Sequence, residues 1–177
     1  MTFKALLLTC EDDAKPVASL AELTDADLPD GDVIVDVAYS GLNYKDGMCL
    51  NGLGRLVRAY PHVAGVDMAG VVRASKDDRY KAGDEVILTG WRVGEVWWGG
   101  FAQRASVKAD WLLLMPEGFT AKTAMGVGTA GMSAMLAIMA LEDAGITPDA
   151  GPVLVTGATG GVGSIAVQLL ARRGYQV

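Results

Sequence analysis

Histidine and cysteine are scarce in this chain. Its 177 residues include one histidine, His62, and two cysteines, Cys10 and Cys49. A catalytic zinc ion needs about three protein ligands within reach of one another, and these residues are not spaced as such a site. We therefore expect no metal, and we expect His62 to be a packed or solvated loop residue. Two cysteines also make no disulfide framework, which predicts a reducing, cytoplasmic location.

Positive charge is also in short supply. Lysine and arginine number 15 against 21 aspartates and glutamates, so the formal net charge is −6. A negative chain without a basic cluster is not expected to bind nucleic acid. The first ten residues carry one lysine and a short apolar run, and acids follow from Glu11. This is not the pattern of a signal peptide.

One long segment lacks charge altogether. Residues 123–141 are uncharged and long enough to cross a bilayer. Glycines crowd the first half of the segment, Thr129 and Ser133 interrupt its apolar face, and no basic cluster flanks it. We expect a buried helix that leads into a sheet domain, with a membrane span as the weaker alternative.

Short strands separated by turns dominate the chain before residue 120. The alternating run Val33–Val37 follows a turn at Pro29–Asp32, and the run Glu85–Thr89 follows a turn at Lys81–Asp84. Glycines within residues 63–73 predict bends or bulges there. Further strands are expected at Phe3–Thr9, Phe101–Val107 and Trp111–Met115. The pattern predicts a small β-barrel or sandwich.

The most informative segment is Val153–Gly163, which reads VLVTGATGGVG. An apolar run, Val153–Thr156, is predicted to be a buried strand, and an amphipathic helix capped by Gly174 follows the glycines. In a dinucleotide-binding fold such glycines let the backbone approach a diphosphate, and the first amides of the helix bind its charge. Ala158 takes the first glycine place of the G-x-G-x-x-G pattern. The predicted cofactor-binding residues here are Thr159, Gly160, Gly161, Val162 and Gly163. A merely structural strand–turn–helix is the alternative.

The order of these segments predicts an α/β fold with a β-rich first part. Residues 1–120 would form the β-barrel domain, and residues 121–177 would open a Rossmann, doubly wound domain. Between the two, Met132, Met135, Leu136 and Met139 recur at helical spacing, and Gly145 caps the helix. Residues 175–177 are expected to begin the next parallel strand, so we expect the N-terminal part of a longer enzyme. The group that selects NAD or NADP normally follows that strand, and the sequence leaves this choice open.

Several motifs occur in the order seen in medium-chain dehydrogenases/reductases. They are Asp32–Val37, Asn43–Asp46, Pro61–Gly70, Gly83–Val86, Trp98–Ala102, Gly128–Gly131 and Thr156–Gly163. The chain most resembles the zinc-free quinone-oxidoreductase branch, and within it the acryloyl-CoA reductase subgroup. The segments SGLNYKDG (40–47), LTGWRVGE (88–95) and MALEDAG (139–145) carry this closer likeness. The resemblance covers the whole chain but only about the first half of a family member. It implies a GroES-like catalytic barrel, a Rossmann cofactor domain, a cleft between them, an NADPH cofactor and a homodimer.

Departures from zinc-dependent relatives agree with the shortage of ligands. Those relatives place a cysteine in the loop that here reads Asn43–Lys45, and a His-Glu pair after the glycine that here is Gly65. This chain has Val66 and Asp67 in place of that pair. Without zinc to polarise an oxygen, reduction of a conjugated double bond is favoured over alcohol oxidation.

The resemblance makes the loop Asn43–Asp46 the expected catalytic site. Tyr44 is the first candidate for contact with nicotinamide and substrate, and its hydroxyl is a candidate proton donor. Asn43 would orient the carboxamide or the substrate carbonyl, and Asp46 would pair with Lys45 or tune Tyr44. Asn43 followed by Asp46 is also a helix N-cap arrangement, so a structural role stays open for both. Thr129 is expected near the nicotinamide, with tight helix packing as the alternative.

The expected activity is NADPH-dependent reduction of a conjugated enoyl thioester, of the acryloyl-CoA type, by hydride transfer. An NADPH:quinone oxidoreductase is the alternative. A non-catalytic GroES-like assembly module would explain the barrel but not the glycine turn. Arg55, Arg58 and Arg92 are candidates for CoA phosphates, although a solvated surface is their more ordinary role. We expect Trp91, Trp97 and Trp98 to form one cluster in a core or cleft wall.

Overall fold

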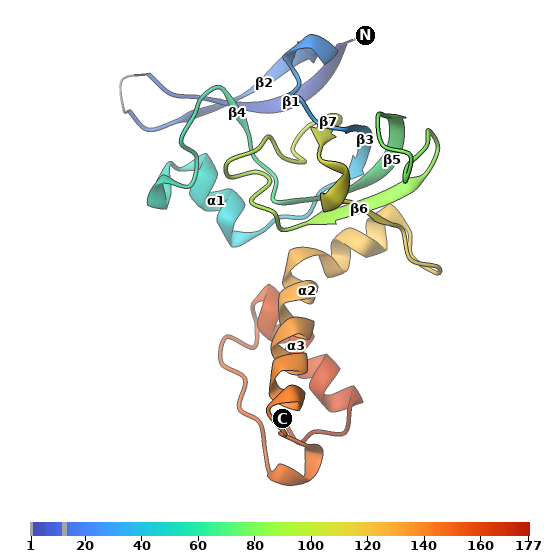
Figure 1. The fold of residues 1–177 in the computed structure, drawn as a ribbon. Helices are drawn as coiled ribbons and strands as arrows, with labels where there is room; N and C mark the ends of the chain where they lie inside the picture. Colours follow the sequence, from blue (N-terminus) through green and yellow to red (C-terminus); the bar gives the residue numbers. More distant parts are fainter. Residues whose placement is uncertain (1, 12–13) are drawn as a thin grey trace. The chain divides into compact units, whose positions relative to one another are not determined.

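The computed structural model describes residues 2–11 and 14–177, which divide into two units (Figure 1). Unit 1 reaches Gly126 and contains all the strands of the described residues. Unit 2 comprises Val127–Val177 and is built on two helices, α2 and α3.

A three-stranded antiparallel sheet begins unit 1. Its order is β2-β1-β4, with β1 at Thr2–Thr9, β2 at Val17–Thr24 and β4 at His62–Val63. The expected strand Phe3–Thr9 is confirmed, but β2 was not predicted. Most of the β2 side chains are exposed, so the strand lacks the alternation of apolar and polar residues that marks a half-buried strand. His62 lies in β4 and is buried, so the expectation of a loop residue is wrong.

A five-stranded antiparallel sheet forms the rest of the barrel. Its order is β7-β3-β5-β6-β8. The strands are β3 (Val33–Tyr39), β5 (Asp67–Ser75), β6 (Glu85–Thr89), β7 (Arg104–Val107) and β8 (Leu113–Leu114). The prediction of a bend or bulge near Gly70 is confirmed, because the β3–β5 register shifts between Val37, which pairs with Gly70, and Tyr39. A Cβ at Gly70 would also lie 2.2 Å from the carbonyl oxygen of Asp36, so the two backbones approach closely there.

Residues 101–107 join the two sheets. The carbonyl of Phe101 accepts a hydrogen bond from Leu6 of β1 (2.8 Å), and Gln103 accepts one from Val37 of β3 (2.9 Å). Only the second half of this expected strand is therefore a regular strand. The expected strand Trp111–Met115 is also shorter, because a 3-10 turn, η3 (Ala109–Trp111), occupies its start.

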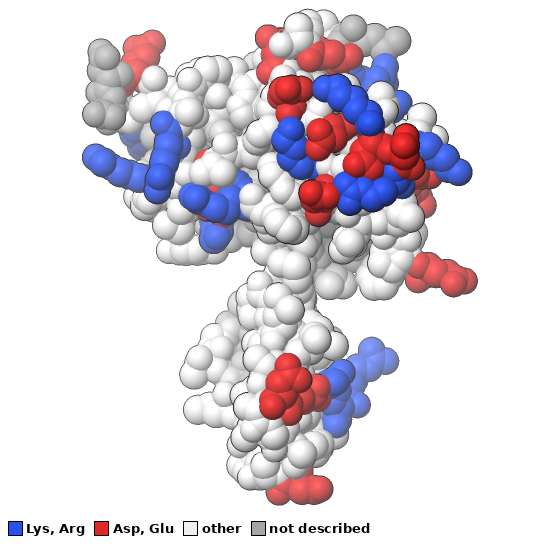
Figure 2. Space-filling model, viewed as in Figure 1, with Lys and Arg blue, Asp and Glu red and all other residues white. Residues whose placement is uncertain are grey.

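Alternate residues of the larger sheet form the main core of unit 1. Val33, Val35, Met68, Val72, Val86 and Leu88 are among its buried members. Acidic and basic side chains gather in one cluster on unit 1 (Figure 2), and ion pairs join residues of the turns beyond the strand ends: Lys76 with Asp30, Arg79 with Asp110 and Lys108 with Asp32. Three short helical elements complete the unit: η1 (Asp25–Asp27), α1 (Tyr44–Leu50) and η2 (Leu53–Arg55).

Unit 2 packs α3 (Gly161–Arg172) against the second part of α2 (Ala121–Asp143), with a short turn, η4 (Pro148–Ala150), between them. Both expected glycine caps are confirmed. Gly145 and Gly174 have φ of +82° and +89°, in the left-handed region that glycine adopts without strain. Arg173 pairs with Glu142 through two hydrogen bonds of 2.7 and 2.5 Å.

Two expectations for this unit are wrong in this chain. Val153–Thr156 is extended but is not a regular strand, because within the described residues its backbone makes one ladder-like hydrogen bond, from the amide of Val153 to Gln176 (2.8 Å). The helix α2 is only partly buried, and its buried residues form a narrow stripe of Ala124, Gly128, Gly131, Ala134 and Ile138. Within unit 2 only α3 and the extended segment after η4 are present to cover it.

By length and composition alone, α2 is apolar enough to cross a membrane, with a mean hydropathy of 1.7. The same property is typical of helices in the cores of soluble proteins. Gly128, with φ +48° and ψ −154°, breaks the helical conformation within the segment. The expectation that it does not span a bilayer stays a prediction.

Candidate active site

The loop that precedes α1 carries the predicted catalytic residues. Asn43 is extended (φ −122°, ψ 157°) and serves as the N-cap of α1. The carboxylate of Asp46, three residues later, accepts a hydrogen bond from the Asn43 amide at 2.8 Å. This is the helix-cap arrangement that the sequence left open. It fixes where the helix begins, and it leaves the Tyr44 side chain free to point outward.

Asp46 holds the loop to the barrel. Its side chain is fully buried, and its second oxygen accepts a hydrogen bond from the amide of Val66 at 2.9 Å. Burial raises the pKa of this carboxyl, while hydrogen bonds from Asn43 and Val66 act in the opposite direction. Both oxygens thus accept hydrogen bonds from backbone amides, which hold the loop in place, and a catalytic part for Asp46 stays a prediction. The expected pairing of Asp46 with Lys45 is wrong, because Lys45 binds Glu95 instead.

Asp67 is a second buried anchor, which the sequence did not identify as part of the site. Its carboxylate accepts a hydrogen bond from the Gly41 amide (2.7 Å) and one from Asn43 Nδ2 (3.0 Å). Its carbonyl accepts one from the hydroxyl of Ser40 (2.7 Å). A Cβ at residue 41 would lie 2.9 Å from Asp67 Oδ1, so this approach requires glycine. The only sequence signal was its place after Gly65 and Val66, where zinc-dependent relatives differ.

Tyr44 follows Asn43 in the loop that Asp46 and Asp67 hold, and its side chain is 85% exposed. Leu42, just before it, is 87% exposed. A large apolar side chain and a phenol on a rigid, hydrogen-bonded loop are typical of a surface that receives a ligand. The position fits the predicted role of Tyr44, and that role stays a prediction.

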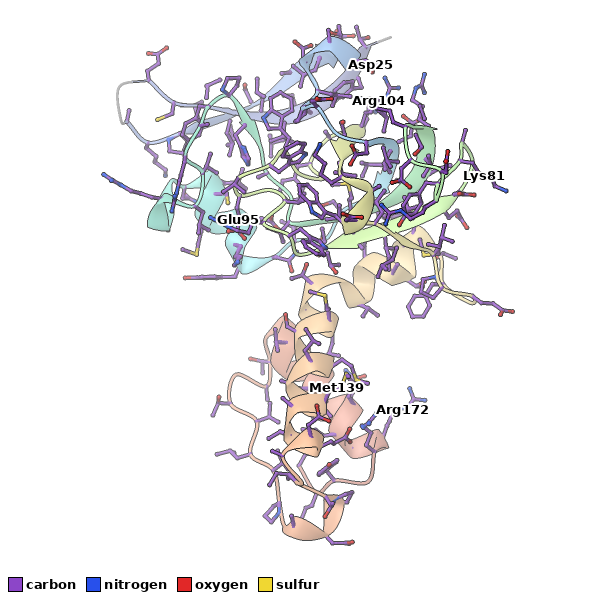
Figure 3. The ribbon with its side chains drawn as sticks, in the orientation of Figure 1. Asp25, Lys81, Glu95, Arg104, Met139 and Arg172 are labelled. Carbon is purple, nitrogen blue, oxygen red and sulfur yellow. The ribbon has the colours of Figure 1, made fainter. Side chains whose placement is uncertain are left out.

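Glu95, which is labelled in Figure 3, pairs with two cations of the same region. Its side chain is 6% exposed, with Lys45 Nζ at 2.8 Å and Arg92 Nε at 3.6 Å. The place of Glu95 could not be predicted from the sequence, because a single glutamate carries no signal that it will be buried beside two cations.

Two further groups with possible chemical roles, Cys49 and His62, are buried. Burial, reinforced by the charges of Asp46 and Glu95, raises the pKa of Cys49 to about 11, so its thiol is protonated at neutral pH. His62 is buried and its Nε2 has no hydrogen-bond partner within the described residues. Among residues 2–11 and 14–177, no three His, Cys, Asp or Glu side chains are grouped to hold a metal ion.

The three tryptophans do not form the single cluster that was expected, and Trp91 is 59% exposed, so it is not a core residue. Trp91 and Trp97 both pack on Trp111, at centroid distances of 6.4 and 5.3 Å. Trp98 packs instead against the core around Phe3. A pocket of about 320 Å³ between η1 and β3 includes none of the predicted site residues.

The glycine turn of unit 2 has the shape that a diphosphate site needs. Gly157 adopts φ +62°, and its carbonyl accepts the amide of Gly160 at 2.9 Å. A Cβ at Gly163 would lie 2.3 Å from the Gly157 carbonyl oxygen, so turn and helix touch backbone to backbone. Thr159, Gly160, Gly161 and Val162 are exposed. The first amides of α3 have no carbonyl one turn earlier to bind, so they are available to an anion.

Thr129 follows the break in α2 at Gly128 and so begins a new helical stretch. Its neighbour Ala130 packs against α3, because a Cβ at Gly161 would lie 3.1 Å from the Ala130 Cβ. The small residues here therefore serve tight helix packing, and the cofactor contact of Thr129 stays a prediction.

The fold and these segments first define a class of protein. A GroES-like domain followed by the opening of a nucleotide-binding domain is the architecture of medium-chain dehydrogenases/reductases, as the sequence predicted. The alcohol dehydrogenase GroES-like domain family matches residues 29–117, half of the chain, and the chain belongs to this family.

Individual relatives confirm the resemblance to the acryloyl-CoA reductase subgroup and its quinone-oxidoreductase branch. Acrylyl-CoA reductase AcuI of Ruegeria pomeroyi is 57% identical over 176 residues, which cover 99% of this chain and 53% of that protein. A quinone oxidoreductase of Sus scrofa is 30% identical over 152 residues, which cover 84% of this chain and 43% of that protein.

Solved structures agree. The yhdH oxidoreductase of Salmonella enterica in complex with NADP matches with a TM-score of 0.95 and 55% identity, covering 100% of this chain and 54% of that chain. Bacillus subtilis yhfP with NAD bound matches with a TM-score of 0.93 and 45% identity, covering 99% and 53%. The chain thus spans about half the length of the relatives that it matches.

Proposed function

We propose that the complete protein reduces a conjugated enoyl thioester of the acryloyl-CoA type with NADPH. The observation that carries the proposal is the 57% identity to an acrylyl-CoA reductase over almost the whole chain. The glycine turn supports the cofactor, because its backbone approach and exposed helix amides fit a dinucleotide diphosphate. The NADP bound to the Salmonella relative favours NADP over NAD, and the NAD bound to the Bacillus relative is the competing evidence.

The chain's own residues have distinct parts in this proposal. Thr159, Gly160, Gly161, Val162 and Gly163 bind the diphosphate, and Thr129 contacts the nicotinamide end. Asp46 and Asp67 hold the Asn43–Tyr44 loop. Asn43 and Tyr44 orient the substrate, and the Tyr44 hydroxyl supplies a proton. No metal takes part, and the protein works as a cytoplasmic homodimer.

When bound, a reduced nicotinamide supplies a hydride to the β-carbon of the substrate. Negative charge then develops on the thioester oxygen, and a proton is added at the α-carbon. Enoyl thioester, NADPH and a proton thus give the saturated thioester and NADP⁺. Each well-placed donor near that oxygen would stabilise the transition state by about 3 kcal/mol. The remaining task of the protein is to position both reactants and to exclude water.

A substrate panel tests the proposal. Full-length protein with NADPH would be given acryloyl-CoA, crotonyl-CoA and benzoquinone, and kcat/KM would be compared. We expect acryloyl-CoA to be preferred over benzoquinone by at least about tenfold, a difference of about 1.4 kcal/mol in transition-state binding. A quinone reduced far faster than either thioester would overturn the proposal in favour of the quinone oxidoreductase.

A titration of NADPH fluorescence separates both enzymes from the assembly module. Either enzyme binds the cofactor saturably, whereas the module gives no saturable change.

A further inference from the structure

Two cations share one buried carboxylate beside the Tyr44 loop. Oε1 of Glu95 accepts a hydrogen bond from Lys45 Nζ at 2.8 Å, and Oε2 lies 3.6 Å from Arg92 Nε. The Glu95 side chain is 6% exposed, while those of Lys45 and Arg92 are 56% and 53% exposed. Each cation therefore forms an ion pair with the buried Glu95 carboxylate and keeps further N–H donors that face solvent.

Arg92 is presented by a rigid loop. Trp91 and Arg92 have φ of +57° and +59°, a left-handed backbone conformation that residues other than glycine rarely adopt. Val93, next in the chain, is fully buried. A Cβ at Gly94 would lie 2.7 Å from the backbone of Gly65, so the loop rests directly on the barrel. The backbone that carries Arg92 is therefore held against the barrel, so little backbone freedom is left to lose when a ligand binds.

The charge arrangement differs from the structural ion cluster elsewhere in unit 1. Arg104 is 7% exposed and pairs with two carboxylates, Asp25 and Asp36, so its charge is already matched. At Glu95 the numbers of cations and carboxylates are reversed: two exposed cations pair with one carboxylate. The nearby carboxylates of Asp46 and Asp67 are buried and take amide donors of the loop. Lys45 and Arg92 therefore share one ion-pair partner within the described residues, and more than half of each side chain is open to solvent.

We propose that Lys45 and Arg92 bind phosphate groups of the nucleotide tail of an acyl-CoA substrate. This inference rests on the proposed function, because it assigns the anion to that substrate. A guanidinium and an ammonium that are held side by side match phosphate oxygens in geometry and charge. Lys45 follows Tyr44 directly, so the site lies at the rim of the substrate loop, where the pantetheine arm would lead outward. Quinones have no phosphate, so the site would favour the thioester.

The test compares two thioesters in full-length protein: acryloyl-CoA and the acryloyl thioester of N-acetylcysteamine, which has no phosphate. Lys45→Met and Arg92→Gln should each raise KM for acryloyl-CoA about tenfold, the effect of losing one charge-assisted contact. Neither variant should change KM for the short thioester or the NADPH dissociation constant more than about twofold. Lys45→Arg, which keeps the charge, should retain most of the CoA affinity.

The matched control is Lys81→Met. Lys81 is exposed, makes no ion pair within the described residues, and lies at the opposite end of unit 1 from Glu95 (Figure 3). It should leave every constant unchanged. Equal losses for both thioesters would mean that the cations only support the loop, and would overturn the inference. Weaker NADPH binding with unchanged thioester constants would assign the phosphates to the cofactor and overturn it as well, as would no effect at all.

Direct binding keeps this inference separate from the proposed function. Calorimetric titration with CoA and with pantetheine needs no turnover. If the wild-type protein reduces no thioester, the proposed function fails, whatever these titrations give. If it reduces acryloyl-CoA but Lys45→Met and Arg92→Gln bind CoA as tightly as wild type does, only the inference fails.

Discussion

Asn43 and Asp67 are joined by a hydrogen bond from Nδ2 to Oδ2 of 3.0 Å, across 24 residues of sequence. The bond ties the cap of α1 to the first residue of β5. Because Asp67 is 1% exposed, the hydrogen bonds that the loop donates help to offset the cost of burying its carboxylate. The position of Tyr44 therefore depends on a buried pair that the family likeness did not single out.

The direction of this hydrogen bond can be reversed by exchanging its partners. Asn43→Asp alone brings two carboxylates together, and Asp67→Asn alone replaces a charge-assisted hydrogen bond by a weaker one for which the Asn43 amide must turn its oxygen toward residue 67. Each should lower Tm by several degrees, consistent with a loss of about 1–3 kcal/mol. The double variant should recover most of that loss. In it, the side-chain amide introduced at position 67 would donate to the carboxylate introduced at position 43, and its carbonyl oxygen would still accept from Gly41.

Thermal unfolding and kcat/KM of the full-length variants measure the two effects separately. A double variant no more stable than the sum of the single losses would contradict the pairing. Recovered stability without recovered activity would show that the Asn43 amide itself contacts a reactant.

Gly160→Ala tests the diphosphate site without disturbing the fold. An added Cβ meets only the Gly157 carbonyl oxygen, at 3.3 Å, and φ is −79°. We expect Tm to change little and the NADPH dissociation constant to rise at least about tenfold, because the methyl occupies the approach of the phosphate. Gly126→Ala, with nothing within 4 Å, is the control and should leave binding unchanged. An unchanged NADPH affinity in Gly160→Ala would show that the diphosphate does not bind at this turn.

Tyr44→Phe removes a hydroxyl from an exposed side chain. Stability should stay constant, since no fold contact is lost. If the hydroxyl delivers the proton, kcat should fall about 100-fold while KM changes little. Steady-state kinetics with acryloyl-CoA measure this effect. An unchanged kcat would show that a group other than the Tyr44 hydroxyl donates the proton.

His62 should make the protein sensitive to acid. Burial lowers the pKa of its imidazole, against a smaller opposite effect of a hydrogen bond with Gly94, so the ring is neutral in the folded state near pH 7. Its contribution to stability is present above the unfolded pKa of 6.5 and is lost as pH falls through the folded pKa. The drop in Tm between pH 7.5 and pH 5.5 should therefore be larger for wild type than for His62→Leu. Equal drops would show that His62 is not the group that titrates.

Much of the fold could be predicted from sequence because its signals are local. The turns before β3 and β6, the caps at Gly145 and Gly174 and the glycine turn before α3 all appear in short segments. The predictions that were wrong concern segments whose structure depends on neighbouring strands. β2 is an edge strand with exposed side chains, and Val153–Thr156 has no neighbouring strand among the described residues to complete a ladder.

The site divides in the same way. Asn43 and Asp46 could be predicted as a cap, since their spacing alone specifies it. Asp67 and Glu95 could not, because their importance comes from burial against residues 24 and 50 positions away. A carboxylate that anchors a loop looks in sequence like any surface acid.

The central claim is that a hydride passes from a nicotinamide to the β-carbon of an enoyl thioester. It is tested most directly with NADPH dideuterated at nicotinamide C4, acryloyl-CoA and the full-length protein. Mass spectrometry and NMR of the product should find one deuterium at C3 of propionyl-CoA and a solvent-derived hydrogen at C2. A product without deuterium at C3, or no saturated thioester at all, would contradict the account.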